Sequence, residues 1–209
     1  MFRVITKHPI AVNSPDHLHP LGTKFDNSLN LRFNNKLIGL FPGKIAVLDL
    51  GCAGGGMVES FIKQGHTAIG LEGSDYSQKA KRAAWGTIPG NLFTCDVVQP
   101  FTVTANGGDP FQFDVVTAWE FFEHIAEADL DSVVDNVRRH LKAGGYLICS
   151  ISSFDCVKRG IHYHQTLQKR PWWVNLFETR GFKRRTDLES RFGVDWVRIV
   201  HYGLVMEKV

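Results

Sequence analysis

The sequence predicts an α/β protein: a single doubly wound domain with a mostly parallel, seven-stranded sheet, an antiparallel C-terminal hairpin and helices on both faces. Three observations predict this fold. Apolar runs of strand length alternate with amphipathic helical patterns. A glycine-rich turn at residues 51–56 follows the first of these runs and leads directly into a helical pattern. After the last helix, two further strand-like segments follow each other without a helical crossover.

The parallel part of the sheet is predicted from five apolar runs without polar alternation, as expected of strands buried on both faces. They cover residues 45–50, 67–72, 92–95, 113–118 and 146–151. Helical patterns lie between them at 58–64, 77–85 and 130–141. The last is the clearest, with apolar residues every third or fourth position and a basic last turn before Gly144 and Gly145.

The two ends of the chain differ from this alternation. A helix is expected at 171–180, followed by strands at 182–188 and 196–206 with a turn at 191–194 between them. At the other end, Asp26 is a suitable N-cap for a helix over 27–40. We therefore divide the chain into an N-terminal segment, residues 1–43, and a core, residues 44–209.

Composition narrows the class of protein. The 209 residues are 44% hydrophobic and 22% charged, as in a soluble globular domain. No apolar run is long enough to span a bilayer and the N-terminus lacks the apolar core of a signal peptide, so a cytoplasmic protein is expected. Four cysteines without a CxxC pair are interpreted as reduced thiols. A net charge of +3 is far from that of a dedicated nucleic-acid binder.

Acidic residues stand at the carboxyl ends of successive predicted strands. They are Asp49 before the glycine turn, Glu72, Asp96, and Glu120 after Trp119. In an open α/β sheet these ends meet at one edge, where ligands bind. A carboxylate at the position of Glu72 can accept both hydroxyls of a ribose, and Asp96 is placed to reach an adenine amino group.

Together these features resemble the class I S-adenosylmethionine-dependent methyltransferases over residues 44–206. The resemblance implies a Rossmann-like fold, S-adenosylmethionine as cofactor and S-adenosylhomocysteine as product. It implies that the glycine turn holds the methionine end, that Glu72 holds the ribose, and that Asp96 flanks the adenine. The complete set of implied cofactor-binding residues is Asp49, Gly51, Cys52, Ala53, Gly54, Glu72, Gly73, Ser74, Asp96, Val97 and Trp119.

One position departs from that family's acidic-x-Gly-x-Gly-x-Gly pattern, because Ala53 replaces the middle glycine. A single methyl group is tolerable there. The alternative for such a turn is a nicotinamide dehydrogenase, but the sequence does not provide the required Gly-x-Gly-x-x-Gly.

A metal site is predicted next to the fourth strand. On a helical turn, Glu120 shares a face with Glu123 and His124. Two carboxylates and an imidazole suit Mn²⁺ or Mg²⁺. The ExxEH pattern resembles ubiquinone-pathway O-methyltransferases and small-RNA 2′-O-methyltransferases, in which a further histidine often completes the site. His162 and His164 are the candidates, and we expect that only one of them points inward.

The acceptor hydroxyl can be activated in two alternative ways, by a bound metal or by a histidine acting as general base. A metal chelated by neighbouring hydroxyls would lower the pKa of the attacking hydroxyl. Without a metal, His124 or one imidazole of the His162/His164 pair is the expected general base. The catalytic candidates are therefore Glu120, His124 and His164.

The acceptor is the least constrained part of the prediction. Our leading expectation is a sugar hydroxyl of a glycan, because a vicinal diol is what the metal would chelate. An RNA 3′-terminal ribose would require a more basic surface. A phenol of the quinone pathway is a third acceptor, although the chain lacks an evident membrane-surface helix. A non-enzymatic S-adenosylmethionine sensor would have lost the carboxylate–histidine cluster that is present here. By the same resemblance, the histidine-rich segment 14–28 is expected to fold over the cofactor as a lid; the alternative is a solvated arm with two exposed histidines.

Overall fold

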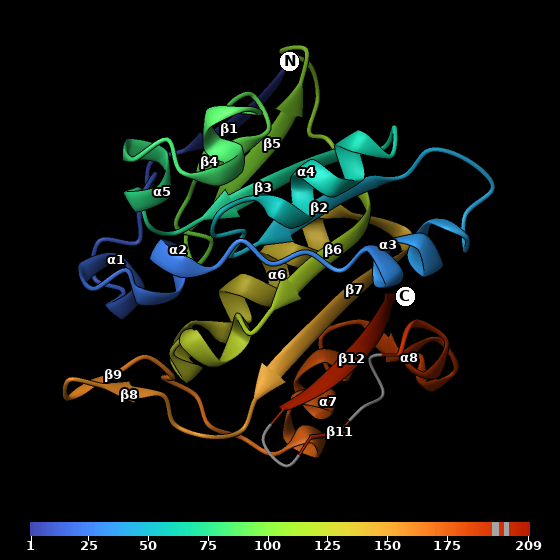
Figure 1. Cartoon of the computed structure of the whole chain (residues 1–209). Helices are drawn as coiled ribbons and strands as arrows, with labels where there is room; N and C mark the ends of the chain where they lie inside the picture. Colours follow the sequence, from blue (N-terminus) through green and yellow to red (C-terminus); the bar gives the residue numbers. More distant parts are fainter. Residues whose placement is uncertain (194–196, 199–200) are drawn as a thin grey trace.

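A central sheet organises the structure, a computed structural model that describes residues 1–193, 197–198 and 201–209 (Figure 1). The strand order is β10-β12-β7-β6-β2-β3-β4, with β11 paired to β12. The five strands from β7 to β4 are parallel, whereas β12 runs antiparallel to both β7 and β10. The strands are β2 (Ala46–Leu50), β3 (Thr67–Glu72), β4 (Leu92–Thr94), β6 (Phe113–Trp119), β7 (Leu141–Ser152), β10 (Phe182–Arg184), β11 (Val197–Arg198) and β12 (His201–Lys208). The predicted fold class is confirmed.

The strand order creates a crevice in the middle of the sheet. From β2 the chain moves outward through β3 to β4, and then returns to β6 on the other side of β2. The connections that leave β2 and β6 therefore diverge at the carboxyl edge, which is where open α/β sheets bind ligands.

Helices cover both faces of this sheet. Helices α6 (Leu130–His140) and α7 (Arg170–Glu178) pack on one face, and α3 (Leu31–Ile38), α4 (Gly56–Lys63) and α8 (Thr186–Phe192) pack on the other. Strand β2 contributes side chains to the hydrophobic cores on both faces of the sheet. Leu48 lies in the core that contains residues of α6 and α7, and its neighbour Val47 lies in the core that contains residues of α3, α4 and α8. Burial on both sides explains why β2 and β3 are continuously apolar.

The predicted helix over 77–85 is wrong. The segment consists of α5 (Tyr76–Lys79) and a short 3-10 helix, η1 (Ala83–Gly86). Lys81 and Ala83 adopt left-handed φ angles of 47° and 48°, which a helix cannot include. Between them Arg82 directs its guanidinium to the carbonyls of Thr23 and Asp26, a contact with a distant part of the chain.

The C-terminal hairpin is present, but its first strand is shorter than predicted. Strand β10 ends at Arg184, and residues predicted as strand form α8, which ends at Gly193 with a φ of 71°. Leu188 and Phe192 lie one helical turn apart and are buried in the same core as α3 and α4. The predicted turn at 191–194 is thus the end of a helix, and Val194 and Trp196 lie outside the described residues.

The N-terminal segment is more structured than expected. Helix α3 begins at Leu31 and not at residue 27, because Asn30 is its N-cap and accepts a hydrogen bond from the Phe33 amide at 3.0 Å. Asp26 instead accepts one from the Ser28 amide. Two short helices precede it, α1 (Pro15–Leu18) and α2 (Leu21–Phe25).

Further short elements lie outside the main sheet. Strand β1 (Phe2–Thr6) pairs with β5 (Phe101–Ala105), which ties the N-terminus to the core. The hairpin of β8 (Val157–Lys158) and β9 (Ile161–His162) projects from the body of the molecule (Figure 1). Two 3-10 helices, η2 (Phe122–His124) and η3 (Glu127–Asp129), follow β6.

Within the described ranges, every helix is too short or too polar to cross a bilayer. All four cysteines are free thiols, and Cys52, Cys95 and Cys149 are buried.

Candidate active site

A cleft of about 660 Å³ lies at the carboxyl edge of the sheet. One end is lined by the glycine turn, Glu72 and the segment 95–99. The other is lined by Trp119 to Phe121, His124 and Gln165, and the N-terminal segment contributes residues along its length. The cleft therefore brings together Glu72, Asp96 and Glu120, whereas Asp49 lies beneath the glycine turn and is not among the residues that line the cleft.

The glycine turn is held in a left-handed conformation. Gly51, Ala53 and Gly55 have φ angles of 69°, 46° and 81°. Ala53 thus carries a side chain in a conformation that costs roughly 1–2 kcal/mol for an L-residue. Its amide donates to Glu72 Oε2 at 2.9 Å and its carbonyl accepts from Trp85 Nε1 at 2.8 Å. These two contacts hold the strained residue in place.

Glu72 is the most thoroughly anchored carboxylate of the cleft. It is buried, and it accepts hydrogen bonds from the amides of Ala53 and Ser74 and from the Thr23 hydroxyl. Burial raises the pKa of Glu72, and the two amides oppose that rise. Next to it, the Gly73 carbonyl accepts a hydrogen bond from the Ala11 amide.

Asp49 is buried at the end of β2, where its Oδ1 accepts a hydrogen bond from the Thr117 hydroxyl at 2.6 Å. Burial raises the pKa of Asp49 to about 7, the Thr117 contact opposes it, and the charges of Asp26 and Glu72 add to it. A cationic ligand group beside Asp49 would favour its charged form.

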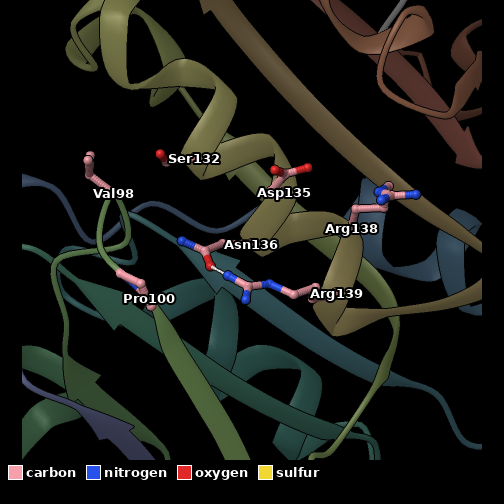
Figure 2. A pocket seen from close by; sticks show the side chains of 7 residues that line it. All are labelled: Val98, Pro100, Ser132, Asp135, Asn136, Arg138 and Arg139. Atoms are coloured by element: carbon pink, nitrogen blue, oxygen red, sulfur yellow. Dashed lines mark hydrogen bonds between the residues drawn. The ribbon is translucent and has the colours of Figure 1, made fainter.

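The segment after β4 carries Asp96, which is half-buried, and Val97, which is buried. Burial raises the pKa of Asp96. A second hollow of about 290 Å³ lies along α6, behind this segment (Figure 2). There Asn136 donates to the carbonyls of Val97 and Gln99, so α6 fixes the loop that presents Asp96.

The N-terminal segment covers the glycine turn directly. Gly54 donates its amide to the Asp26 carbonyl at 3.2 Å, and Arg82 Nη2 donates to the carbonyls of Thr23 and Asp26. A β-carbon added to Gly54 would lie 2.4 Å from Asn27 Oδ1. A larger residue here would therefore displace the side chain of Asn27.

On the acceptor side of the cleft, Glu123, His124 and His164 form a cluster whose ligating atoms lie within 4.8 Å of one another. Glu123 is fully buried; its Oε1 accepts a hydrogen bond from the Ser152 amide, and its Oε2 has no partner among the described residues. Burial and the neighbouring charge of Glu120 raise the pKa of Glu123 to about 8.

Each of the two histidines of the cluster has an acceptor oxygen beside its Nδ1 atom. His124 Nδ1 lies 2.8 Å from Asp16 Oδ2, and His164 Nδ1 lies 2.6 Å from the Phe154 carbonyl. Because both partners are acceptors, the neutral form of each imidazole carries its proton on Nδ1 and keeps a lone pair on Nε2. Burial lowers the pKa of His124, but the contact with Asp16 and the charges of Glu123 and Glu120 together outweigh burial, so the net shift is upward. Burial lowers the pKa of His164.

Two predicted members lie outside the cluster. Glu120 has a φ of 47° and η2 begins only at Phe122, so Glu120 is not on one helical turn with Glu123 and His124. It lines the cleft instead. His162 sits on the projecting hairpin, paired with Asp155 and 63% exposed. Strand β9 ends at His162, and His164 lies beyond it, with its Nδ1 against the Phe154 carbonyl and its ring in the cluster.

Sequence reasoning missed three residues that shape this site: Asp16, Thr23 and Arg82. Each acts across a long sequence separation, Asp16 on His124, Thr23 on Glu72, and Arg82 on the 23–26 segment. The Ser14-Pro15-Asp16 sequence, typical of a helix start, was the one available signal for the position of Asp16.

The fold and the cleft define a class: an α/β protein with a cleft at the carboxyl edge of its parallel sheet and a carboxylate–histidine cluster beside it. A family described as a methyltransferase domain matches residues 24–193. The chain belongs to this methyltransferase-domain family.

Curated relatives share part of this region. A ubiquinone biosynthesis O-methyltransferase of Klebsiella pneumoniae is 38% identical over 113 residues, which is 54% of this chain and 43% of that protein. One of Nitrosomonas europaea is 33% identical over 125 residues, which is 59% of this chain and 50% of that protein. The chain thus spans half the length of these relatives or less.

Solved structures share the fold over nearly the whole chain. An S-adenosylmethionine-dependent methyltransferase from Clostridium acetobutylicum has a TM-score of 0.62 at 12% identity and covers 91% of this chain and 97% of its own. The glycopeptide N-methyltransferase MtfA, complexed with S-adenosylhomocysteine, has a TM-score of 0.60 at 15% identity and covers 92% and 95%.

Proposed function

We propose that this protein transfers the methyl group of S-adenosylmethionine to a hydroxyl of a sugar in a glycan. The observation that carries the proposal is the arrangement of the cleft. Anchored carboxylates and a left-handed glycine turn line one end of it, and the Glu123–His124–His164 cluster adjoins the other end.

The cofactor end supports the roles that the sequence suggests. In our proposal Asp49, with Gly51, Cys52, Ala53 and Gly54, holds the methionine end, where its carboxylate meets the cationic amino group. The outer lone pairs of Glu72 accept the ribose hydroxyls, since its amide donors already orient the carboxylate. Gly73 and Ser74 lie beside the ribose, and Asp96, Val97 and Trp119 surround the remainder of the nucleoside.

The cluster would also suit a divalent cation. Glu123 offers a buried oxygen without a partner among the described residues, and His124 and His164 each offer an Nε2 lone pair that a hydrogen bond at Nδ1 orients. One carboxylate and two imidazoles favour Mn²⁺ over Mg²⁺. When bound, such an ion acts as a Lewis acid that lowers the pKa of a coordinated hydroxyl. Glu120 and His162 are not required in this arrangement.

The protein's own groups can position and activate the acceptor. Methyl transfer from a sulfonium requires the attacking oxygen in line with the methyl group, so alignment is a large part of catalysis. When no metal occupies the cluster, the Nε2 lone pair of neutral His124 can accept the hydroxyl proton. The polar lining near it, from Asn13, Glu120 and Gln165, offers hydrogen-bond partners to the other hydroxyls of a sugar.

A phenolic acceptor is the second candidate, because the curated relatives are named as ubiquinone biosynthesis O-methyltransferases. RNA is disfavoured. The basic run 183–185 is not a free cationic surface, since Arg184 pairs with Glu189, and Arg185 pairs with Asp187 and Glu207. A net charge of +3 adds little to the attraction for a polyanion.

The test is methyl transfer from labelled S-adenosylmethionine to a panel of monosaccharides and catechols, with Mn²⁺, with Mg²⁺ or with EDTA. We expect labelled sugar, loss of activity in EDTA, and a loss of kcat on the order of 100-fold in Glu123→Gln. Exchange of the exposed residue in His162→Gln is the matched control and should change little. Full activity in EDTA and in Glu123→Gln would remove the metal from the proposal. Transfer to catechols alone would replace the sugar by a phenol.

A further inference from the structure

The contact between Asp16 and His124 joins the two ends of the cleft. Asp16 is the second residue of α1 and His124 closes η2, and 108 residues of chain separate them. Asp16 Oδ2 lies 2.8 Å from His124 Nδ1, and both side chains are about three-quarters buried, with exposures of 23% and 24%. A short contact between two partly dehydrated groups is stronger than the same pair in solvent.

The position of Asp16 is fixed locally. Ser14 caps α1, with its hydroxyl accepting a hydrogen bond from the Asp16 amide at 3.1 Å, and Pro15 occupies the first helical position. Just beyond α1, the His19 carbonyl accepts a hydrogen bond from the Tyr163 hydroxyl at 3.0 Å. Helix α1 is thus attached to the acceptor side of the cleft at both Asp16 and His19.

The same segment is attached to the cofactor side. The Ala11 amide donates to the Gly73 carbonyl at 2.9 Å, and the Thr23 hydroxyl donates to Glu72 Oε1 at 3.2 Å. These contacts lie on either side of Asp16 in the sequence. Any movement of residues 11–23 away from Glu72 and Gly73 would therefore also carry Asp16 away from His124.

We propose that Asp16 is a positioning residue for His124, and that it makes the orientation of His124 depend on closure of residues 11–23 over the cofactor. With Asp16 in place, His124 carries its proton on Nδ1, and its Nε2 lone pair faces Glu123 and His164. When the segment opens, the imidazole is free to rotate and to change tautomer. The proposal rests on the function proposed above, since closure is attributed to the bound cofactor.

Among the groups around His124, Asp16 is the one whose oxygen contacts Nδ1 and can orient the ring. Besides Asp16, the ring faces the carboxylates of Glu123 and Glu120 and the ring of His164, whose centroid lies 4.8 Å away. Glu123 Oε1 already accepts from the Ser152 amide, and His164 Nδ1 already contacts the Phe154 carbonyl. Asp16 is the acceptor that lies against Nδ1 of His124.

The direct test is the tautomer of His124, read from its ring ¹⁵N resonances by NMR at alkaline pH with S-adenosylhomocysteine bound. We expect an Nδ1–H imidazole in the wild-type protein and loss of that state in Asp16→Ala. Asp16→Asn, which keeps an acceptor oxygen, should retain it in part. Asp155→Ala is the matched control, because it removes the same kind of contact, 2.7 Å to His162 Nδ1, outside the cleft. It should alter the His162 resonances and leave those of His124 unchanged.

Mn²⁺ affinity, measured by calorimetry, is the second readout. Loss of the hydrogen bond that orients a ligating histidine lowers metal affinity about 10- to 100-fold. We expect a loss of this size in Asp16→Ala with S-adenosylhomocysteine bound, while the affinity for S-adenosylhomocysteine itself shows that the variant is folded. The wild type should bind Mn²⁺ more tightly with S-adenosylhomocysteine than without it, and Asp16→Ala should not.

These outcomes separate the two proposals. An unchanged His124 tautomer in Asp16→Ala, or the same tautomer with and without S-adenosylhomocysteine, would overturn the role of Asp16 whatever the activity. A changed tautomer without methyl transfer to any sugar would leave the role of Asp16 intact and overturn the proposed acceptor.

Discussion

Replacing Asp49 by asparagine should make the cofactor-free protein more stable at neutral pH and weaken its binding of S-adenosylmethionine. Asp49 is only 4% exposed, and its burial raises its pKa from 3.8 to about 7. The asparagine side chain would keep an oxygen that accepts the Thr117 hydroxyl, but it would carry no charge.

The sign of the pH dependence follows from the direction of this shift. Between about pH 4 and pH 7 the folded protein retains a proton that the unfolded chain has released. The free energy of unfolding therefore falls as the pH rises through this window. A rise in pKa from 3.8 to about 7 corresponds to about 4 kcal/mol, on the scale of roughly 1.36 kcal/mol for each pKa unit. The asparagine variant lacks this dependence.

The assay is thermal unfolding of both proteins from pH 4 to pH 8 without cofactor. The gap in melting temperature should widen with pH and reach on the order of 10 °C above pH 7, given about 2–4 °C per kcal/mol for a chain of this size. Thr117→Val removes the hydroxyl that favours the charged carboxylate and should extend the decline to higher pH. A gap that stays constant across this range would refute the reasoning.

Although Asp49→Asn should make the cofactor-free protein more stable, it should lower the affinity for S-adenosylmethionine. A hydrogen bond to a charged group contributes about 1.5–3 kcal/mol, so Asp49→Asn should weaken S-adenosylmethionine binding by roughly 10- to 150-fold. Calorimetry at pH 8 measures it. An unchanged dissociation constant would remove Asp49 from the proposed methionine site.

Two further predictions concern the glycine turn and the cluster. Gly54→Ala should separate the lid, residues 14–28, from the glycine turn, because the new β-carbon would lie 2.4 Å from Asn27 Oδ1. We expect calorimetry to show S-adenosylmethionine binding weakened at least about tenfold. An unaltered affinity would show that the lid does not close on Gly54. His164→Ala should lower the affinity for Mn²⁺ by at least about 10-fold, because His164 belongs to the cluster with Glu123 and His124. His162→Ala should leave that affinity unchanged, because His162 lies outside the cluster. Equal losses in the two variants would contradict the assignment of His164 as a metal ligand.

The parallel core could be predicted closely from the sequence, except that β7 begins at Leu141 and not at residue 146. Strand β3 has the predicted bounds, and β2 begins one residue later than predicted. Both are buried on their two faces, so the signal is a continuous apolar run that needs no knowledge of the rest of the chain. The carboxylates at the strand ends followed from the same pattern.

The errors lie where distant contacts decide local structure. The break at Arg82 depends on carbonyls of the N-terminal segment, and β1 is stabilised by a partner about a hundred residues away. Helix α8 begins within the predicted strand 182–188, because Leu188 and Phe192 pack against an apolar surface on one face of the sheet. Local propensity is a weak guide when such packing overrides it.

The candidate site likewise contains residues that a local pattern predicted and residues that only the folded chain brings together. Glu123 and His124 follow a strand directly and were predicted, whereas the choice of His164 over His162 needed the hairpin geometry. Asp16 gave no sequence signal of its contact with His124, since nothing local links residues so far apart.

The central claim is that this cleft holds S-adenosylmethionine, and calorimetric titration of the purified protein tests it most directly. We predict one binding site for S-adenosylmethionine, its loss or strong weakening in Glu72→Gln, and no heat of binding with NADH. Binding of NADH without binding of S-adenosylmethionine would contradict the claim.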